Sequence, residues 1–361
     1  MSRSSILDLP SEQDAEHPRR NGTNSALGDV VPYPTALIKI GFVPLLDCAP
    51  LVLAKELGYF KEHGLHVQLV REPGWASIRD KVAYGELAAA HALAGLCFAI
   101  SWGQGVVSRP CLTGLLFNSH GDAVTLASKF IDAGVTDAIS LESYVQIEQR
   151  RLTFGIPHLF SSHHFLLRQW LRSGNLVPGK EVELVVLPPS QMNACLEEGF
   201  LDGFCVGEPF NTTASRNDSG SVMATSVDLV PMHPEKAFLV TEDFAEKRPE
   251  DHFALIQAIT QACQLCDTDD GREQVARILS QRSYLNCDEK LLHGSLGADR
   301  PEFHLFHGDD VNAPSKDKAN WLITQMRLSQ VIDKNHRYLP AADQIFREDI
   351  YRASVGTAIS A

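Results

Sequence analysis

Four short stretches of this chain carry side chains that could bind a small polar ligand. They are GWASIRDKV (74–82), SSHHFLLRQWL (161–171), VLPPSQM with GFLDGFCVGEPFN (186–192 and 199–211), and HPEKA (233–237). Trp75 offers an indole N–H that can only donate, His163 offers a ring N–H, and Lys236 offers a compact positive charge. One cation among neutral N–H donors is chemistry that suits a small anion.

The sequence lacks the motifs of several common catalytic sites. It contains no G-x-S-x-G nucleophile elbow, no Walker loop and no H-E-x-x-H zinc helix. No Cys or carboxylate lies at metal-site spacing beside His158, His163 and His164, so we predict no metal and no cofactor. The eight cysteines are scattered, and we expect the closest pair, Cys263 and Cys266, to pack as apolar side chains on one helix face.

Length and charge limit the class of protein. The chain has 361 residues, of which 44% are hydrophobic and 21% charged, a balance typical of a globular protein with two lobes of ordinary size. Its net charge of −13 argues against direct binding to nucleic acid, which needs a basic face. A locally positive pocket for a small anion remains compatible with this charge.

The first 35 residues predict where the protein works. They are polar and punctuated by proline, which is typical of a disordered tail. A secretory signal needs an apolar run of roughly 7–15 residues, and a membrane helix needs about 18. Because the chain has neither, we expect a cytoplasmic protein with no membrane insertion.

The elements that must position these residues alternate between strand and helix. Predicted strands span 37–44, 66–70, 123–128, 152–154, 181–187 and 201–206. Predicted helices span 49–57, 76–85, 162–173, 191–198 and 318–332, and the chain from about 221 to 351 is expected to be mostly helical. We further expect Asp47 to cap the first helix, and residues 118–121 to form a turn.

This alternation predicts an α/β fold with parallel strands. Chain crossovers near residues 122 and 222 divide it into a tail (1–35), lobe I (36–122 plus 222–361) and lobe II (123–221). A ligand would bind in the cleft between the lobes, outside the carboxyl ends of the strands.

The order and spacing of the four stretches resemble a known family. Together with GFVPLLDCAPLVLAKELGYF (41–60) and the late Asn312-Ala-Pro, Trp321 and Gln325-Met326, they resemble the nitrate and bicarbonate receptor proteins of ABC importers (NrtA/CmpA-like). In detail they are most similar to cytoplasmic nitrate sensors of the NasS type. The resemblance runs from Leu37 to Tyr351 and implies a periplasmic-binding-protein-like type II fold, with nitrate or nitrite as the ligand.

The resemblance also implies which residues bind the anion. Trp75, His163 and Lys236 match family positions that contact nitrate. A further donor is expected from Asn118 or Ser119, where related sensors carry an Asn-containing turn.

Glu208, in Gly-Glu-Pro-Phe, fits a turn or hinge between neighbouring turn formers. Alternatively, its carboxylate contacts and orients Lys236 or His163 without touching the anion itself.

Three functions follow from the resemblance. A NasS-type sensor would bind an RNA-binding antiterminator of the NasT type and release it when nitrate or nitrite arrives. An importer's receptor for nitrate or bicarbonate would instead need export; Lys236 favours nitrate, because the bicarbonate receptors place an acidic, calcium-assisted group there. Enzymes like the thiamin-pyrimidine synthases share the fold but use a cysteine-rich iron motif, and this chain has no such cluster.

Overall fold

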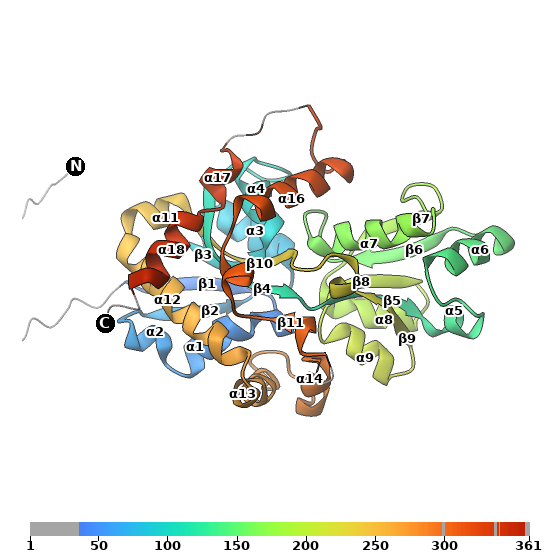
Figure 1. The fold of residues 1–361 in the computed structure, drawn as a ribbon, viewed down its shortest axis with the longest axis horizontal. Helices are drawn as coiled ribbons and strands as arrows, with labels where there is room; N and C mark the ends of the chain where they lie inside the picture. Colours follow the sequence, from blue (N-terminus) through green and yellow to red (C-terminus); the bar gives the residue numbers. More distant parts are fainter. Residues whose placement is uncertain (1–35, 298–299, 336–337, 339, 358–361) are drawn as a thin grey trace, which may run out of the picture. The chain divides into compact units, whose positions relative to one another are not determined.

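Two β-sheets flanked by helices make up the described part of the chain (Figure 1). The computed structural model describes residues 36–297, 300–335, 338 and 340–357. The polar tail expected over residues 1–35 lies outside the described residues. Both sheets belong to one compact unit, Thr35–Ala361.

Among the described residues, six strands form the first sheet, in the order β11-β4-β10-β3-β1-β2. They are β1 (Ile38–Phe42), β2 (Val67–Arg71), β3 (Ala89–Leu93), β4 (Cys111–His120), β10 (Pro234–Thr241) and β11 (His304–Leu305). β1 pairs in parallel with β2 and β3, whereas β10 is antiparallel to both β3 and β4. The strand that carries Lys236 therefore lies inside this sheet and not at its edge.

Five strands of the described chain form the second sheet, in the order β7-β6-β8-β5-β9. They are β5 (Asp122–Ala127), β6 (Leu152–Ile156), β7 (Val182–Val186), β8 (Gly203–Gly207) and β9 (Gly220–Thr225). β6 is parallel to β7 and β8, and β5 is antiparallel to β8 and β9. The chain enters this sheet at Gly121 and returns to the first sheet after Thr225.

Helices fill the connections between the strands. Those up to β5 are η1 (Leu46–Cys48), α1 (Ala49–Glu56), α2 (Tyr59–Glu62), α3 (Trp75–Ala83) and α4 (Ala94–Ser101). Those between β5 and β10 are α5 (Ser128–Asp132), α6 (Ala138–Glu148), α7 (Ser162–Ser173), η2 (Pro189–Gln191), α8 (Met192–Glu197), α9 (Phe210–Arg216) and α10 (Ser226–Leu229). Those after β10 are α11 (Glu242–Lys247), α12 (Pro249–Cys266), α13 (Asp269–Leu279), α14 (Glu289–Ser295), η3 (Pro301–Phe303), α15 (Asp309–Asn312), α16 (Lys316–Leu328), α17 (Ala342–Ile345) and α18 (Glu348–Thr357).

The local sequence explains how α7 begins and where it points. The Ser161 hydroxyl caps the helix by accepting a hydrogen bond from the backbone N–H of His164, at 3.1 Å. The helix buries Leu167 and Leu171, which are one turn apart on one face, and ends before Gly174. His163 consequently lies in the first turn, beside the end of the helix that carries the partial positive charge.

Most predicted elements of the first 207 residues are confirmed, including α7 with its predicted bounds. Cys263 and Cys266 are buried in α12, as expected of apolar packing. Three predictions are wrong. The segment Pro234–Thr241 was expected to be helical, but it forms the strand β10 inside the first sheet. Asp47 does not cap α1, because its carboxylate turns to Lys236 instead. Asn118 does not lie in a turn, because β4 continues to His120.

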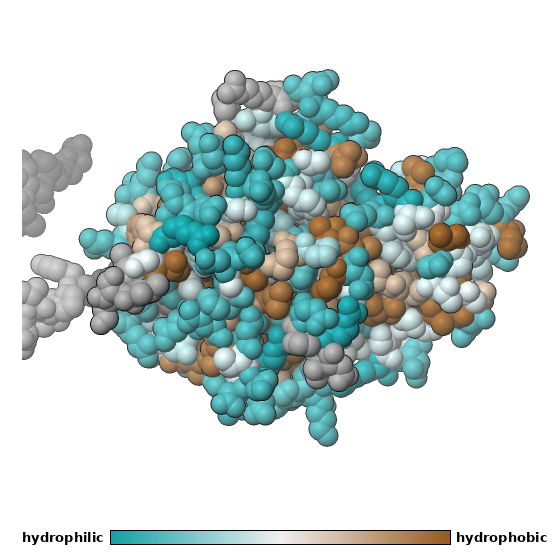
Figure 2. Space-filling model, in the orientation of Figure 1, coloured by the Kyte–Doolittle hydropathy of each residue, from teal (hydrophilic) through white to brown (hydrophobic). Residues whose placement is uncertain are grey.

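The apolar residues lie mainly inside. Figure 2 shows one face of the molecule, on which hydrophilic residues predominate and apolar ones form scattered patches. No helix in the described part of the chain is both long enough and apolar enough to span a bilayer.

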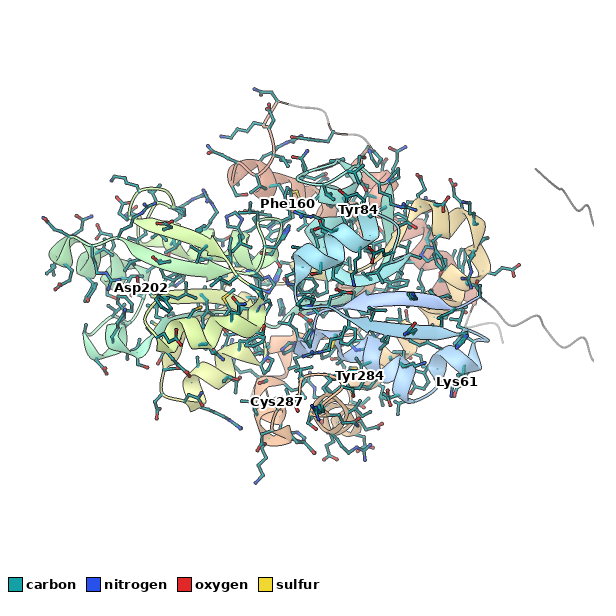
Figure 3. All side chains as sticks on the ribbon, turned by 180° about the vertical axis from the view of Figure 1, so that it is seen from behind. Lys61, Tyr84, Phe160, Asp202, Tyr284 and Cys287 are labelled. Atoms are coloured by element: carbon teal, nitrogen blue, oxygen red, sulfur yellow. The ribbon has the colours of Figure 1, made fainter. Side chains whose placement is uncertain are left out.

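The half of the structure that contains the first sheet and the half that contains the second sheet touch closely beside α4. A Cβ atom on Gly95, in the first turn of α4, would lie 2.2 Å from the carbonyl oxygen of Phe160, in the segment before α7. Figure 3 labels Phe160 where the segment before α7 meets the helices of the first half. Gly74, before α3, faces Pro188 after β7 at an ordinary 3.8 Å. Glycine is thus required at one of these approaches and not at the other.

Candidate functional site

Lys236 lies at the centre of a buried ionic cluster. Its side chain is fully buried, and Nζ donates to Asp47 Oδ2 at 2.7 Å and to the carboxylate of the adjacent Glu235. The ring of Trp75 packs beside it, with 5.4 Å between Nζ and the ring centroid. These side chains come from β10, η1 and the first turn of α3.

Three histidines surround the same carboxylates. His163 Nε2 lies 3.0 Å from Asp122 Oδ1 and 3.5 Å from Glu235 Oε1. His233 Nε2 lies 3.2 Å from Glu235 Oε2 and 3.5 Å from Asp122 Oδ2. His91, on β3, places Nε2 3.2 Å from Asp47 Oδ1. The cluster therefore joins the start of β10 and the first sheet to β5 and α7 of the second half.

The crossing between the sheets brings these groups together. In the pairing of β4 with β10, Asn118 is opposite Lys236 and Ser119 is opposite Pro234. Asp122 follows at once, because the chain turns sharply at Gly121, whose φ is +91°. The ring of His304 lies 2.2 Å from where a Cβ on Gly121 would be, so only glycine fits here.

The three carboxylates of the cluster are held ionised. Burial by itself would raise the pKa of Asp47, but Lys236 and His91 outweigh it and lower that pKa to about 2. Burial also opposes ionisation of Asp122, whose pKa is nevertheless held well below its usual range by His163 and His233. At Glu235 burial and Asp122 raise the pKa, while Lys236 and His163 lower it to a net value below the ordinary one.

The same contacts keep two of the bases protonated. Burial would lower the pKa of His233, but Asp122 and Glu235 raise it to about 9. Burial likewise opposes the charge of Lys236, whose pKa is raised by Asp47, Glu235 and Asp122. Burial lowers the pKa of His91, which therefore stays neutral at neutral pH. Without His163, these groups carry three negative and two positive charges.

Several buried polar atoms around Lys236 have no hydrogen-bond partner among the described residues. They are Trp75 Nε1, Ser119 Oγ, Asn118 Oδ1 and both ring nitrogens of His304. The ring nitrogens of His163 also lack a hydrogen bond of good geometry, although Nε2 lies close to Asp122. Leaving such groups unpaired costs roughly 1–3 kcal/mol each, so a ligand that paired them would gain that much.

The structure brings three of the sequence-predicted residues together and places the others nearby or apart. Trp75, His163 and Lys236 all belong to the buried cluster. Asn118 Nδ2 donates to the carbonyl of His120 at 3.0 Å, so its amide is partly engaged. Ser119 keeps a free hydroxyl, which makes it the better donor of the two.

Glu208 forms different contacts. Its carboxylate accepts the backbone N–H of Thr212 at 3.1 Å, and burial raises its pKa to about 7. Its backbone links the two halves, since its N–H donates to the Gly121 carbonyl at 3.2 Å and its carbonyl accepts from Leu46 at 2.9 Å. The carboxylates beside Lys236 and His163 are Asp47, Asp122 and Glu235, which the sequence analysis did not identify.

Three of these groups could also hold a metal ion. One ligand atom from each of Asp122, His233 and Glu235 lies within 4.8 Å of the others. A divalent cation there would have to displace the proton of His233, because a ligating imidazole is neutral.

Comparisons with known proteins agree with this architecture. A family model described as NMT1-like matches residues 32–280. The chain is 35% identical to the nitrate import ATP-binding protein NrtC of Synechocystis sp. strain PCC 6803, over 87% of this chain and 49% of that protein. It is 36% identical to the bicarbonate transport ATP-binding protein CmpC of Synechococcus elongatus, over 80% of this chain and 44% of that protein. The chain thus spans about half the length of these relatives.

A solved structure covers the chain more fully. The periplasmic nitrate-binding protein NrtA from Synechocystis PCC 6803 superposes with a TM-score of 0.85 at 26% identity, covering 89% of this chain and 88% of that one. This likeness confirms the expected α/β fold of the periplasmic-binding-protein type.

Proposed function

The chain belongs to the NMT1-like family, and on that premise we propose that it is a solute-binding protein whose ligand is nitrate or nitrite. Relatives named as nitrate/nitrite binding proteins, together with the solved nitrate-binding protein NrtA, support a non-enzymatic role. The observation that carries the proposal is the set of unpaired buried groups around Lys236, namely Trp75 Nε1, Ser119 Oγ and His163 Nδ1. Nitrate accepts hydrogen bonds through three oxygens and needs such donors in one place.

The surrounding carboxylates add a condition to this binding. Lys236 is already paired with Asp47 and Glu235, so it offers an anion less than a full free charge. We expect the cluster to take up a proton when nitrate binds, because its three ionised carboxylates already outnumber Lys236 and protonated His233 and a further anion would increase the net negative charge.

Titration calorimetry with nitrate and nitrite tests both points. Nitrate heats measured in buffers of different ionisation enthalpy should reveal close to one proton taken up per anion bound. Chloride serves as the control, because it is spherical and cannot engage donors arranged for a planar ion. Equal affinity for chloride and nitrate would contradict the proposal.

We propose further that the protein is a cytoplasmic sensor of the NasS type. Support comes from the resemblance of the four sequence stretches to sensors of this type. In this role nitrate would weaken binding to a NasT-type RNA-binding antiterminator partner, and by linkage the partner would weaken nitrate binding by the same factor. A coupling of roughly 1–3 kcal/mol is typical.

Two measurements separate this role from that of an importer's receptor. The first is nitrate affinity with and without the partner. The partner should lower this affinity if the protein is a sensor, and should leave it unchanged if the protein is an importer's receptor. The second is a fusion of the first 60 residues to a reporter that is active only after export. The sensor role predicts a silent reporter, and strong activity would favour the receptor.

The cluster of Asp122, His233 and Glu235 favours one alternative ligand, bicarbonate bound together with a divalent cation. The identity to a bicarbonate transport protein supports it as well. Calorimetry with bicarbonate in the presence of calcium, and again with a chelator, distinguishes the two. Binding of bicarbonate that depends on calcium, with no binding of nitrate, would replace nitrate as the ligand.

A further inference from the structure

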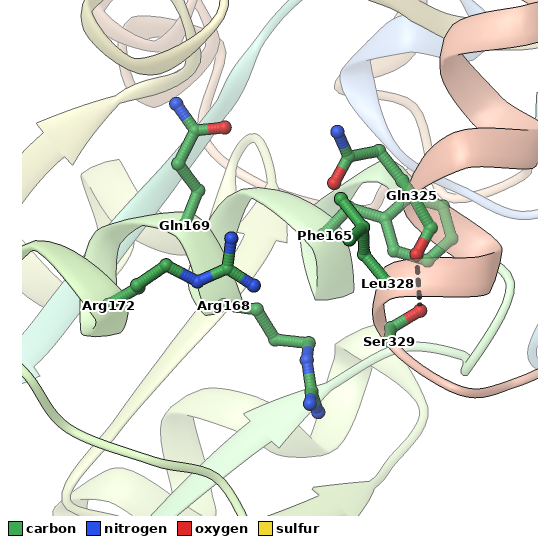
Figure 4. Close-up of a pocket in the computed structure, with 7 residues that line it drawn as sticks. All are labelled: Phe165, Arg168, Gln169, Arg172, Gln325, Leu328 and Ser329. Carbon is green, nitrogen blue, oxygen red and sulfur yellow. Dashed lines mark hydrogen bonds between the residues drawn. The ribbon is translucent and has the colours of Figure 1, made fainter.

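A cavity lies between α7 and α16, away from the ionic cluster. Figure 4 shows the side chains of Arg168 and Arg172 extending from α7 beside the end of α16, which carries Gln325 and Ser329. The cavity encloses about 110 Å³. One water needs only about 10–15 Å³ of such space, so a tetrahedral group of several heavy atoms fits.

The two arginines have no acidic partner. Within the part of the chain that the structure describes, neither guanidinium forms an ion pair or a hydrogen bond, whereas Arg150 and Arg248 pair with Asp202 and Asp251. Arg168 and Arg172 are one helical turn apart, so their like charges repel each other. Burial and this repulsion together lower the pKa of Arg168. In a chain with a net charge of −13, such an uncompensated pair is unexpected.

Stabilisation of the helix end accounts for only part of this arrangement. Arg172 lies in the last turn of α7, where a cation interacts favourably with the helix dipole. Arg168 is a turn earlier and half-buried, and it lines the cavity without that benefit. Within the described residues, no acidic side chain compensates the half-buried charge of Arg168 or the exposed charge of Arg172 beside it.

The neighbouring polar groups define the chemistry of an occupant. A guanidinium presents its N–H donors as a planar fork that matches the oxygens of phosphate or carboxylate. Gln169 Nε2 is engaged by the carbonyl of Leu229 at 2.9 Å, and the Ser329 hydroxyl donates to the carbonyl of Gln325 at 2.7 Å. Both side chains keep oxygen acceptors, which could receive the O–H of a singly protonated phosphate.

A second hollow extends from the same two arginines. It encloses about 230 Å³ and is lined by Arg168, Arg172 and the segment Asn175–Pro178 after α7. An organic group attached to the oxyanion would have room there.

We propose that Arg168 and Arg172 form a second anion site, for a doubly charged oxyanion of the phosphate or phosphomonoester class. An occupant would contact α7 in the half with the second sheet and α16 in the half with the first, and so would link the two halves.

Calorimetry on the full chain, saturated with nitrate, tests this site with inorganic phosphate as the probe. We expect one phosphate per chain, with affinity reduced roughly tenfold or more by Arg168→Gln and by Arg172→Gln. Arg327→Gln is the matched control, since Arg327 is exposed on α16 and does not line the cavity. Formate, a single negative charge, should bind more weakly than phosphate. Phenyl phosphate binding more tightly than inorganic phosphate would assign the second hollow to the organic group, and equal binding would restrict the site to the free ion.

Three results would overturn the proposal. They are no binding of phosphate, phosphate binding that both arginine variants retain, and competition between phosphate and nitrate for one site. Thermal unfolding of each variant shows whether it is folded, and glutamine at these partly exposed positions is not expected to prevent folding.

Discussion

At the scale of single residues, the site combines tightly paired charges with buried polar atoms that have no hydrogen-bond partner. Lys236 is held by two carboxylates, whereas Trp75 Nε1 and Ser119 Oγ are buried without a partner. A buried N–H without an acceptor weakens the folded protein, and it is kept only where something else accepts the hydrogen bond. The unpaired donors are therefore better markers of the ligand than the charged residue alone.

Trp75→Phe should lower nitrate affinity, whereas the same change at another indole should not. The change keeps a six-membered aromatic ring but loses the unpaired N–H and the five-membered ring of the indole, so the small cavity left behind should also lower the free energy of unfolding. Nitrate binding should weaken by about 1.5–3 kcal/mol, the net value of a hydrogen bond to a charged acceptor. Trp102→Phe is the control, because Trp102 Nε1 donates to the Pro340 carbonyl at 2.9 Å and should lose stability but not affinity. Unchanged affinity in Trp75→Phe would remove this residue from the site.

Lys236→Met should damage both folding and binding, because it leaves Asp47 and Glu235 buried without their shared cation. Breaking such a pair typically costs about 3–5 kcal/mol of stability. Adding Asp47→Asn removes one of the orphaned charges and should restore part of the stability, measured by urea unfolding, but none of the nitrate affinity. If the double variant regained nitrate binding, Lys236 would be structural and not a ligand contact.

At the scale of elements, the sequence predicted the helices and strands whose starts and ends depend on neighbouring residues. The cap at Ser161 and the stop at Gly174 define α7 without help from other segments. β10 was missed, because its eight residues are all buried and show no alternation, and the segment was expected to be helical. Its identity depends on insertion between β3 and β4, which are distant in sequence.

The missed carboxylates have the same cause. Asp47 resembles a helix cap in sequence, and only the approach of β10 shows that Lys236 is its partner. Asp122 and Glu235 were unmarked, although each is adjacent to a feature that was recognised, the Gly121 turn and Lys236 itself. Residue types predicted the donors, whereas the acids that hold them in place follow from tertiary contacts.

Gly95→Ala should weaken ligand binding without affecting either sheet. The new methyl group would lie 2.2 Å from the Phe160 carbonyl, so the segment before α7 must move away from α4 and take His163 with it. Gly74→Ala is the matched control at the same junction, since its Cβ would meet Pro188 at an ordinary 3.8 Å. We expect small-angle scattering to show a more open Gly95→Ala protein with lower nitrate affinity, and no change in Gly74→Ala. Equal affinity in the two variants would mean that closure at α4 does not govern binding.

At the scale of the whole molecule, buried ionisable groups join the halves and make stability depend on pH. Asp47, with its pKa lowered to about 2, contributes stability above its ordinary value of 3.8, and this is lost as pH falls through 2. Glu208, with its pKa raised to about 7, contributes stability below 4.5 that is lost as pH rises through 7. Above pH 7 the raised pKa of His233 makes the protein less stable as pH rises, while Lys318, whose pKa is lowered to about 8 by burial, acts in the opposite direction from pH 8 upward.

His233 should make the protein less stable as pH rises from 6.5 to beyond 9. Its pKa is raised from 6.5 to about 9 by Asp122 and Glu235, so its contribution is complete below 6.5 and vanishes above 9. At 1.36 kcal/mol per pKa unit, the contribution of His233 to the free energy of unfolding should fall by about 3 kcal/mol over this range. His233→Gln should be less stable at pH 6.5 but lose this slope, whereas His293→Gln, a change at an exposed histidine beside Glu289, should keep it. Urea unfolding at pH 6.5, 8 and 9.5 measures the slope, and a His233→Gln protein with the slope of the parent would show that another group carries it.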